Sequence, residues 1–471
     1  MSKLICGDFI KKLNQYKTPF LLLLSASTIG LLTAYFMTNV NGFFLPALLL
    51  IGLALLILTF KNPEVIFALF LASGAFKTYK IVGSISSFFD LTALLGLLSF
   101  IGVVYEIWKT KKDSIVFPKV LFLLYFLIVI VSSLSLIYSP AQVYGSEKLF
   151  KLITLTTFSF VAPFFLLKTS ISFKRFLSVF LVIGILMVFD VFVNGLNAGN
   201  IGFYSALGAN YLMFGRIEGF ALIVCMFYFF INTDSILNKV IYMGVGAALL
   251  FGLLLSAARG PLISLIISSA FLSLYALIRL IMKHRESFTA NNKYELRIIN
   301  LTILIVIVAA SFFLFFREYF ATLLYRIANI KTGFEESLIV RMSMYDRALE
   351  VLLAFPRNLI GLGLGGYSVF YTGSDSKAYP HNIFLEIGSE SGLFALLIFL
   401  SLVVYVFVYI IKRIGSTKSF LDKSLLFTIL GLFIFMLINA SFSLDINDNR
   451  LLFTIMSLAF SVKEGKSDLQ T

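Results

Sequence analysis

Long apolar segments are the feature of this sequence that most constrains its fold. They recur along the whole chain, and a helix of about 20 apolar residues is what the hydrocarbon core of a bilayer requires. The 471 residues are 59% hydrophobic and only 13% charged, and the mean hydropathy is +0.98. A soluble domain would carry roughly a quarter charged residues. The sequence therefore predicts an all-α polytopic membrane protein and argues against a water-soluble fold.

Fourteen candidate spans can be drawn, and because the third and the last are short we expect about 12–14 transmembrane helices. They lie near residues 20–37, 42–60, 64–77, 87–107, 118–138, 149–167, 175–196, 217–232, 238–257, 261–282, 298–316, 382–411, 424–442 and 451–462. No small-residue cleavage site follows the first span, so we interpret it as a retained helix rather than a signal peptide. Cys6 and Cys225 suggest neither a disulfide framework nor a metal site.

The basic residues indicate an orientation. If the N-terminus lies in the cytoplasm, five clusters of Lys and Arg fall on the cytoplasmic side, as the positive-inside rule requires. These clusters are Lys3, Lys11, Lys12 and Lys17; Lys109, Lys111 and Lys112; Lys168, Lys174 and Arg175; Lys283, Arg285, Lys293 and Arg297; and Lys412, Arg413, Lys418 and Lys423. The C-terminus is then cytoplasmic as well. The same rule accounts for the net charge of +14, so we expect the lipid bilayer, and no nucleic acid, as a partner.

One long hydrophilic segment, residues 317–380, interrupts the apolar pattern on the opposite, outer side. Its residues 335–355 alternate apolar and charged positions with a helical period, which predicts an amphipathic helix. Pro356 and the glycines of IGLGLGGYS then predict a break and a tight turn. We accordingly divide the chain into N-terminal transmembrane helices (1–200), helices that carry outer-face arginines (201–316), an extracytoplasmic loop (317–380) and C-terminal transmembrane helices (381–471).

Two of the arginines on the outer side, against the usual distribution of charge, lie close to predicted spans before the long outer segment. Arg259, in LLSAARGPLISL, precedes Gly260 and Pro261, which predict a turn into the next helix. A guanidinium beside a helix N-terminus favours an anion, although an arginine at a helix end can also simply extend to the interface. Arg216 lies in GANYLMFGRIEGFAL, and an ion pair with Glu218 is the structural alternative to a role in binding.

His381, in YPHNIFLEIGSESGLF, is one of only two histidines. It opens a predicted helix on the same outer side, and an imidazole can act as a base near neutral pH. The alternative is an interfacial polar residue. Nearby arginines would disfavour the imidazolium and lower its pKa. Asn382, Glu386 and Glu390 follow along one stripe of this helix.

The ordered set SAARGPLISL, RMSMYDRALEVLLAFPRNLIGLGLGGYSVF and HNIFLEIGSESGLF resembles the O-antigen ligase and O-antigen polymerase family. FGRIEGFA resembles an earlier Arg-x-x-Gly element of that family, so the resemblance covers residues 215–393. It departs from the pattern after Arg216, where the Asn-Pro-Asn of many members is missing. The stretch SFSLDINDNRLLF offers no pattern that separates a ligase from a polymerase.

The resemblance implies a glycosyltransferase of the bacterial cytoplasmic (inner) membrane that acts on its outer side. The donor would be an undecaprenyl-pyrophosphate-linked glycan and the acceptor a glycan or a lipid A core, with a chain-length regulator as a further partner. Arg216 and Arg259 would bind the pyrophosphate and His381 would deprotonate the acceptor hydroxyl, with inversion at the anomeric carbon. Substrate contacts are expected from the set Arg341, Arg347, Tyr367 and Asn382. No metal and no cofactor are expected, because arginines would stabilise the leaving phosphate.

Four functions remain open at this level. A surface-polysaccharide polymerase is favoured slightly, and an O-antigen ligase that joins the glycan to lipid A core is the alternative. A polysaccharide or lipid transporter (flippase) is the alternative of another class, because many spans suit it equally well. Asp190 and Asp90 are then the deep acidic candidates, since transporters place charges near the bilayer midplane. A receptor-like or structural membrane protein would need no outer Arg/His cavity at all.

Overall fold

The computed structural model describes residues 44–76, 90–109, 117–195, 203–284, 293–315, 317–328 and 336–462. The expected first span, residues 20–37, lies outside the described residues. The chain divides into two compact units, Met1–Asn62 and Pro63–Thr471. In the first unit the described part is one helix, α2 (Phe44–Lys61).

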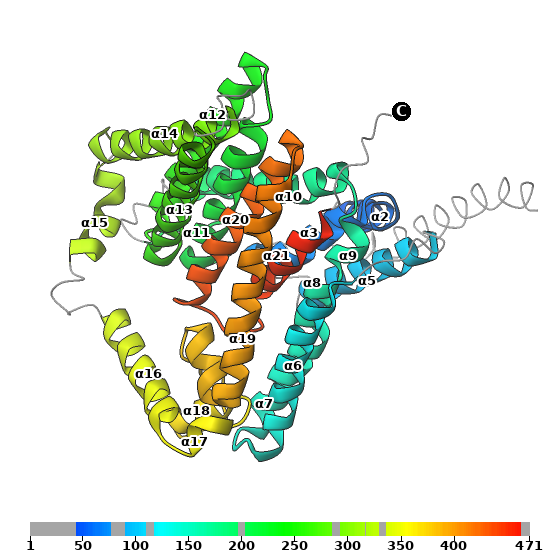
Figure 1. Ribbon diagram of the computed structural model, residues 1–471, viewed down its shortest axis with the longest axis vertical. Coiled ribbons are helices and arrows are strands. Elements are labelled where there is room, and N and C mark those ends of the chain that lie inside the picture. Colours follow the sequence, from blue (N-terminus) through cyan, green and yellow to red (C-terminus); the bar gives the residue numbers. More distant parts are fainter. Residues whose placement is uncertain are drawn as a thin grey trace, which may run out of the picture. The chain divides into compact units, whose positions relative to one another are not determined.

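The second unit is helical throughout its described part (Figure 1). Its first half contains α3 (Pro63–Ala72), η1 (Ser73–Ala75), α5 (Leu91–Lys109), α6 (Lys119–Ser135), η2 (Leu136–Tyr138), α7 (Gln142–Lys151), η3 (Leu152–Thr156), α8 (Thr157–Val161), α9 (Pro163–Leu166), α10 (Ser170–Asp190) and η4 (Val191–Gly195). Its second half contains α11 (Tyr211–Ile223), η6 (Val224–Phe230), α12 (Ile236–Leu255), α13 (Arg259–His284), α14 (Lys293–Phe315), η8 (Arg317–Phe320), α15 (Ala321–Ala328), α16 (Glu336–Leu353), α17 (Arg357–Ile360), α18 (Gly366–Thr372), α19 (Ile383–Ser416), α20 (Phe420–Ala440) and α21 (Arg450–Ser461).

Ten helices among the described residues are long and apolar enough to cross a membrane, and three further apolar helices are shorter. The prediction of an all-α polytopic membrane protein is confirmed. The short third and last spans correspond to Pro63–Ala75 and Arg450–Ser461. Several boundaries differ from the prediction. The span expected at 217–232 begins at Tyr211, and the span expected at 149–167 begins at Gln142, because α7, η3, α8 and α9 form one nearly continuous helix to Leu166. Lys148 therefore lies inside a membrane helix.

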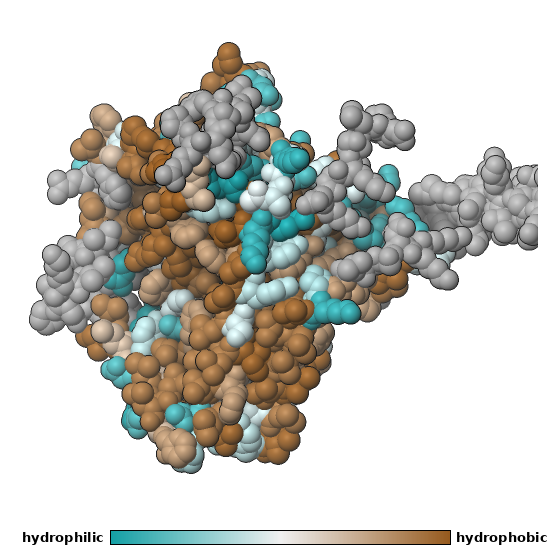
Figure 2. Space-filling model, viewed as in Figure 1, coloured by the Kyte–Doolittle hydropathy of each residue, from teal (hydrophilic) through white to brown (hydrophobic). Residues whose placement is uncertain are grey.

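The membrane helices differ in how far the protein itself encloses them. α11 with η6 is 89% buried and α20 is 72% buried, so these helices form the centre of the second unit. Other helices expose apolar faces: Leu123 and Leu134 of α6 and Val404 of α19 are each more than half exposed. Hydrophobic surface, coloured brown, covers much of the face seen in Figure 2. Such faces suit lipid tails, which replace protein as the apolar surroundings of a membrane helix.

Small residues let α11 approach its neighbours closely. A Cβ at Gly219 would lie 2.5 Å from the ring of Phe435 in α20. A Cβ at Gly215 would lie 2.8 Å from the Ser256 hydroxyl and 3.0 Å from Ala258, which precede α13. Glycine at these positions therefore brings the end of α20 and the α12–α13 turn against the first half of α11, as small residues commonly do between membrane helices.

The long hydrophilic segment packs against α19. The amphipathic helix expected at 335–355 is α16, and Pro356 and the glycines end it as predicted. The backbone N–H groups of Leu362 and Gly363 donate to Ser389 and Glu390 carbonyls at 2.8 Å each. Gly361 has φ +75°, and a Cβ there would lie 2.6 Å from the Glu390 carbonyl oxygen. Only glycine allows this left-handed turn to approach α19 so closely.

Candidate functional site

His381 lies in the connection between α18 and α19, immediately before the helix. Asn382 is the N-cap of α19, and its side-chain oxygen accepts hydrogen bonds from the N–H groups of Phe384 (2.9 Å) and Leu385 (3.2 Å). His381 itself has φ +56°, a left-handed conformation that few residues other than glycine adopt. Its ring packs 4.5 Å from that of Tyr379, and its buried Nδ1 has no hydrogen-bond partner among the described residues. The backbone thus holds a half-buried imidazole with an unused polar atom.

The surroundings of His381 keep its imidazole neutral. Burial, the largest cause, and the positive charges of Arg341, Lys377 and Arg216 together lower the pKa of His381 to about 4. These three cations come from α16, from the connection before α19 and from α11. The expected lowering of the pKa by neighbouring arginines is confirmed, and a lysine that the sequence did not single out contributes to it.

Arg216 is 5% exposed and reaches the C-terminal end of α20. Its Nη2 donates to the carbonyls of Asn439 and Ser443 at 3.2 Å each. The alternative of an ion pair with Glu218 is wrong, because the two side chains leave α11 in different directions. Glu218 is fully buried beside Gly184 and Gly252, and neither of its carboxylate oxygens has a hydrogen-bond partner among the described residues.

Arg259 is the first residue of α13, so a helix begins here as predicted. The turn lies earlier than expected, at Ser256 and Ala257, because Gly260 and Pro261 already belong to the first turn of the helix. The residues that flank it pack near Arg216: Ala258 contacts the Gly215 position, and a Cβ at Gly260 would lie 3.7 Å from Phe442. The start of α13 therefore lies beside the segment whose Ser443 carbonyl binds Arg216. The structure brings the backbones of the two arginines to one end of the helix bundle.

Of the two arginines of α16, Arg341 is the one whose charge acts on both His381 and Arg216. Arg347 instead pairs with Glu350 at 2.8 Å and lies over the Phe370 ring. Tyr367, expected to contact substrate, is fully buried, and its hydroxyl donates to the Met344 carbonyl at 2.8 Å. In this conformation it joins α18 to α16 and presents no surface to a ligand.

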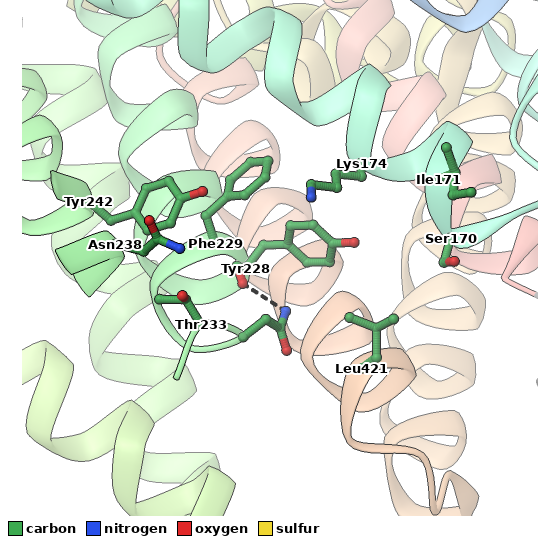
Figure 3. Close-up of a pocket in the computed structure, with 10 residues that line it drawn as sticks. Ser170, Ile171, Lys174, Tyr228, Phe229, Thr233, Asn238, Tyr242 and Leu421 are labelled. Atoms are coloured by element: carbon green, nitrogen blue, oxygen red, sulfur yellow. Dashed lines mark hydrogen bonds between the residues drawn. The ribbon is translucent and has the colours of Figure 1, made fainter. Parts of the chain in front are cut away.

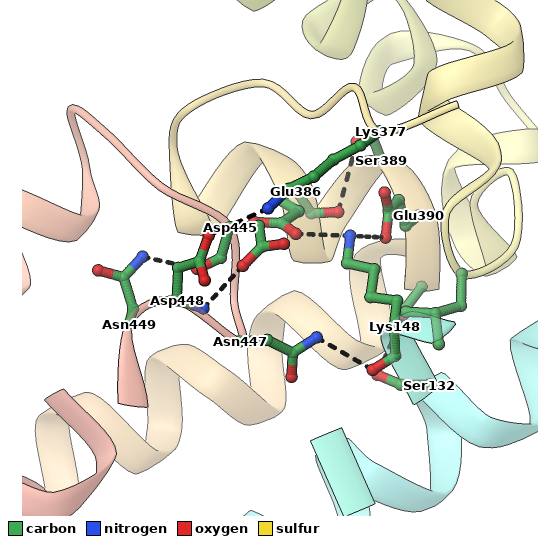
Figure 4. A network of polar contacts seen from close by, with 12 residues as sticks. Ser132, Lys148, Lys377, Glu386, Ser389, Glu390, Asp445, Asn447, Asp448 and Asn449 are labelled. Atoms are coloured by element: carbon green, nitrogen blue, oxygen red, sulfur yellow. Dashed lines mark hydrogen bonds and ion pairs between the residues drawn. The ribbon is translucent and has the colours of Figure 1, made fainter. Parts of the chain in front are cut away.

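The segment between α20 and α21, residues 441–449, is part of the site although the sequence did not indicate it. Asp448 pairs with Lys377 at 3.3 Å, which ties this segment to the connection that carries His381 (Figure 4). Burial and the neighbouring Asp448 raise the pKa of Asp445. Burial alone would lower the pKa of Lys377, but Asp448 and Asp445 outweigh it and raise that pKa. Carboxylates thus lie next to the cations around His381.

A buried ion network lies next to the 441–449 segment and the start of α19. The Lys148 Nζ lies 2.5 Å from Oε1 of Glu386 and 2.5 Å from Oε2 of Glu390, and all three side chains are at most 2% exposed (Figure 4). Asn447 donates to the Lys148 carbonyl at 3.0 Å and accepts from Thr156 at 2.9 Å. The network joins α7 to the first turns of α19 and to the 441–449 segment, and so fixes the helix that follows His381.

A second contact fixes the same connection from outside the network. Asp375 accepts hydrogen bonds from the N–H groups of Val143 (2.8 Å) and Tyr144 (2.9 Å), at the start of α7. A carboxylate at a helix N-terminus satisfies free N–H groups and the helix dipole. The connection that holds Lys377, Tyr379 and His381 is therefore tied to α7 as well as to α19.

The site that results combines three chemical capacities. Arg216, Arg341 and Lys377 supply positive charge that suits phosphate oxygens. The neutral imidazole of His381 can accept a proton. The carboxylates of Asp445 and Asp448 can accept hydrogen bonds from hydroxyl groups, as sugars provide. The sequence contained one signal for the missed residues: two Asp and two Asn lie within DINDN, between two apolar helices.

Residues 244–400 match the family model described as O-antigen ligase. This part of the chain contains α13, Arg341 and His381, and the resemblance to the O-antigen ligase and polymerase family rested on these features. The match confirms that resemblance. No curated protein matches the chain.

Proposed function

We propose that this multi-pass membrane protein, which carries an O-antigen ligase domain over residues 244–400, transfers a glycan from a lipid-linked pyrophosphate donor to a sugar hydroxyl. The observation that carries the proposal is the grouping of Arg216, Arg341 and Lys377 around a neutral His381. Positive charge beside an unprotonated base is what a reaction needs when its leaving group is anionic and its nucleophile is a hydroxyl.

The donor's pyrophosphate is proposed to bind the cations. Arg341 and Lys377 act on His381 from two different elements, and Arg259 opens α13, whose neighbouring residues pack beside Gly215 and Phe442. The C1–O bond to phosphate breaks and its electrons stay on the pyrophosphate, where guanidinium groups can bind two oxygens at once. Arg216 already donates to two carbonyls, so we assign it the role of orienting the site and adding charge rather than clamping the phosphate alone.

His381 is proposed to accept the proton of the acceptor hydroxyl, whose oxygen attacks the anomeric carbon opposite the leaving group and inverts it. General base assistance of this kind contributes roughly 10²–10⁴-fold. A pKa of about 4 makes free His381 a weak base. The phosphates of a bound donor would neutralise the cations that help lower this pKa and would thereby raise the basicity of His381. The site would then activate the acceptor only after the donor has bound.

We propose that the enzyme acts as a surface-polysaccharide polymerase, with the acceptor another lipid-linked repeat unit, and that the alternative is a ligase that uses lipid A core. The test is incubation of the purified protein with a lipid-linked repeat unit alone and with lipid A core added. A ladder of products from the repeat unit alone supports the polymerase. Product only after lipid A core is added supports the ligase, and no product in either mixture contradicts glycosyl transfer.

The proposed location is the bacterial inner membrane, with both termini in the cytoplasm and the site around His381 on the outer side. Cysteine labelling tests this: Ser374→Cys should react with an impermeant reagent from outside and Lys111→Cys only from inside. Labelling of both from one side contradicts the orientation. A transporter receives less support, because its deep acidic candidates have local partners: Asp190 accepts from Leu207 N–H (2.7 Å) and Asp90 from Thr92 N–H (2.7 Å).

A further inference from the structure

A polar pocket lies at the end of the helix bundle opposite the His381 site. Its volume is about 310 Å³, at the lower end of the range of small-ligand sites. Tyr228 lines it and follows Arg216 by about three helical turns, which is on the order of 18 Å along the helix axis. Leu421, at the start of α20, lines it too, whereas Arg216 contacts the end of that helix. The pocket is thus separate from the proposed transferase site.

The pocket wall is polar and carries one cation. The Lys174 ammonium points toward the space between the Tyr228 and Phe229 rings, and the Tyr242 hydroxyl points toward the same space (Figure 3). Ser170 and Asn238 add further polar groups to the wall. Lys174 has no ion-pair partner within the described ranges.

Three helices begin at this pocket: α10, α12 and α20 contribute Ser170, Asn238 and Leu421 from their first turns. Their positive dipole ends add to the charge of Lys174 and favour an anion. Two carboxylates lie near these helix starts. Asp234 lies 3.5 Å from Arg297, and Asp422, in the first turn of α20, carries a negative charge that acts on Tyr228 in the pocket wall.

The rim of the pocket is apolar and exposed. Ile171 on α10 is 57% exposed and Leu421 on α20 is 40% exposed, and both line the pocket. Ile236 and Leu237, which open α12 next to Asn238, are 80% and 69% exposed. A polar, cationic hollow with exposed aliphatic side chains at its edge, at the end of membrane-spanning helices, matches a molecule whose polar head is joined to hydrocarbon chains.

We propose that this pocket binds the phosphate-bearing headgroup of a membrane phospholipid, with Lys174 on the phosphate and the acyl chains along Ile171, Leu237 and Leu421. One remaining acceptor in the wall suits a donor on the headgroup: the Asn232 side-chain oxygen has no hydrogen-bond partner among the described residues, while its amide donates to Tyr228 and Ser424. The site is a binding site for bulk lipid, distinct from the binding of a lipid-linked sugar donor.

The test is native mass spectrometry of the delipidated full-length protein after titration with phosphatidylglycerol, with glucosyl diacylglycerol as the phosphate-free lipid. Wild type should bind the phospholipid preferentially. Lys174→Gln should weaken that binding about tenfold, because a charge-assisted contact to phosphate is lost, and Lys174→Arg should retain it. The matched control is Lys412→Gln, which removes an exposed lysine at the same end of the bundle and outside the pocket. Monodispersity in detergent verifies that each variant is folded.

Two outcomes overturn the proposal. Equal binding of the two lipids, or equal binding of phospholipid by wild type and Lys174→Gln, shows that phosphate is not recognised at Lys174. If inorganic phosphate protects the pocket from thiol labelling as strongly as phospholipid does, the site binds a soluble phosphate and not a lipid. Protection is measured as the labelling rate of an Asn238→Cys variant, which places a thiol in the wall. Because neither readout involves glycosyl transfer, the result is independent of the proposed function.

Discussion

Removal of the Lys148 ammonium should destabilise the protein strongly. Lys148→Met keeps a similar length and removes the charge that lies 2.5 Å from each of Glu386 and Glu390. At an effective dielectric constant of about 20, each of these attractions amounts to about 7 kcal/mol before dehydration is subtracted. Dehydration offsets much of this, but loss of one partner leaves two carboxylates buried without their cation. We expect a loss of about 3–5 kcal/mol in the free energy of unfolding.

The measurement is the unfolding equilibrium in mixed detergent micelles, with transfer activity followed in parallel. The matched control is Lys151→Met, one turn further along α7, where Lys151 pairs with Glu147 but both side chains are substantially exposed. An exposed pair of this kind contributes at most about 1 kcal/mol. If burial is the cause, the two lysines should therefore differ by several-fold in their effect.

A triple variant, Lys148→Met with Glu386→Gln and Glu390→Gln, separates the charge from the shape. It removes every charge of the network and keeps the side-chain volumes, so it should recover most of the stability that Lys148→Met loses. The reasoning is refuted if Lys148→Met is as stable as the Lys151→Met control. It is also refuted if the triple variant is no more stable than the single one, because uncompensated carboxylates would then not be the cause.

Three further predictions concern the candidate site. Protonation of His381 removes the base, so kcat/KM, which reports the free enzyme, should fall as pH drops through about 4. If bound phosphates raise the pKa of His381, kcat should fall at a higher pH, and coincident midpoints for kcat and kcat/KM contradict donor-dependent activation. His381→Asn tolerates the left-handed backbone and should lose roughly 10²–10⁴-fold in kcat. Arg259→Ala should nearly abolish transfer and Arg259→Lys should restore it poorly, because lysine lacks the bidentate fork; full activity of the lysine variant argues against a phosphate contact. Gly361→Ala should lower stability by about 1–3 kcal/mol more than Gly373→Ala. An alanine at Gly361 (φ +75°, ψ −164°) would overlap a carbonyl of α19 in a conformation that essentially only glycine adopts, whereas Gly373 (φ +75°, ψ 4°) is left-handed helical with open space around it. Equal thermal-unfolding midpoints would contradict this reasoning.

The sequence by itself determined those features that depend only on residues close to one another in the chain. Apolar runs specify membrane helices because hydrocarbon leaves the backbone few other ways to satisfy its hydrogen bonds. The helix at Glu336–Leu353, its end before Pro356 and the turn at Gly361 follow from local periodicity and backbone preference. His381, Arg216 and Arg259 are candidates from the sequence because each stands out in its own segment.

Tertiary packing decided which of these residues act on one another. Lys148 and Glu390 are 242 positions apart, and no pattern within a window relates them. The pairing of Lys377 with Asp448 likewise depends on how the 441–449 segment packs, and Tyr367, which stood out in its segment, is buried between helices. The low pKa of His381 follows from burial and from cations on three separate segments. Burial and charge proximity depend on distances in space, and the close packing of helices at glycines such as Gly215 and Gly219 sets those distances.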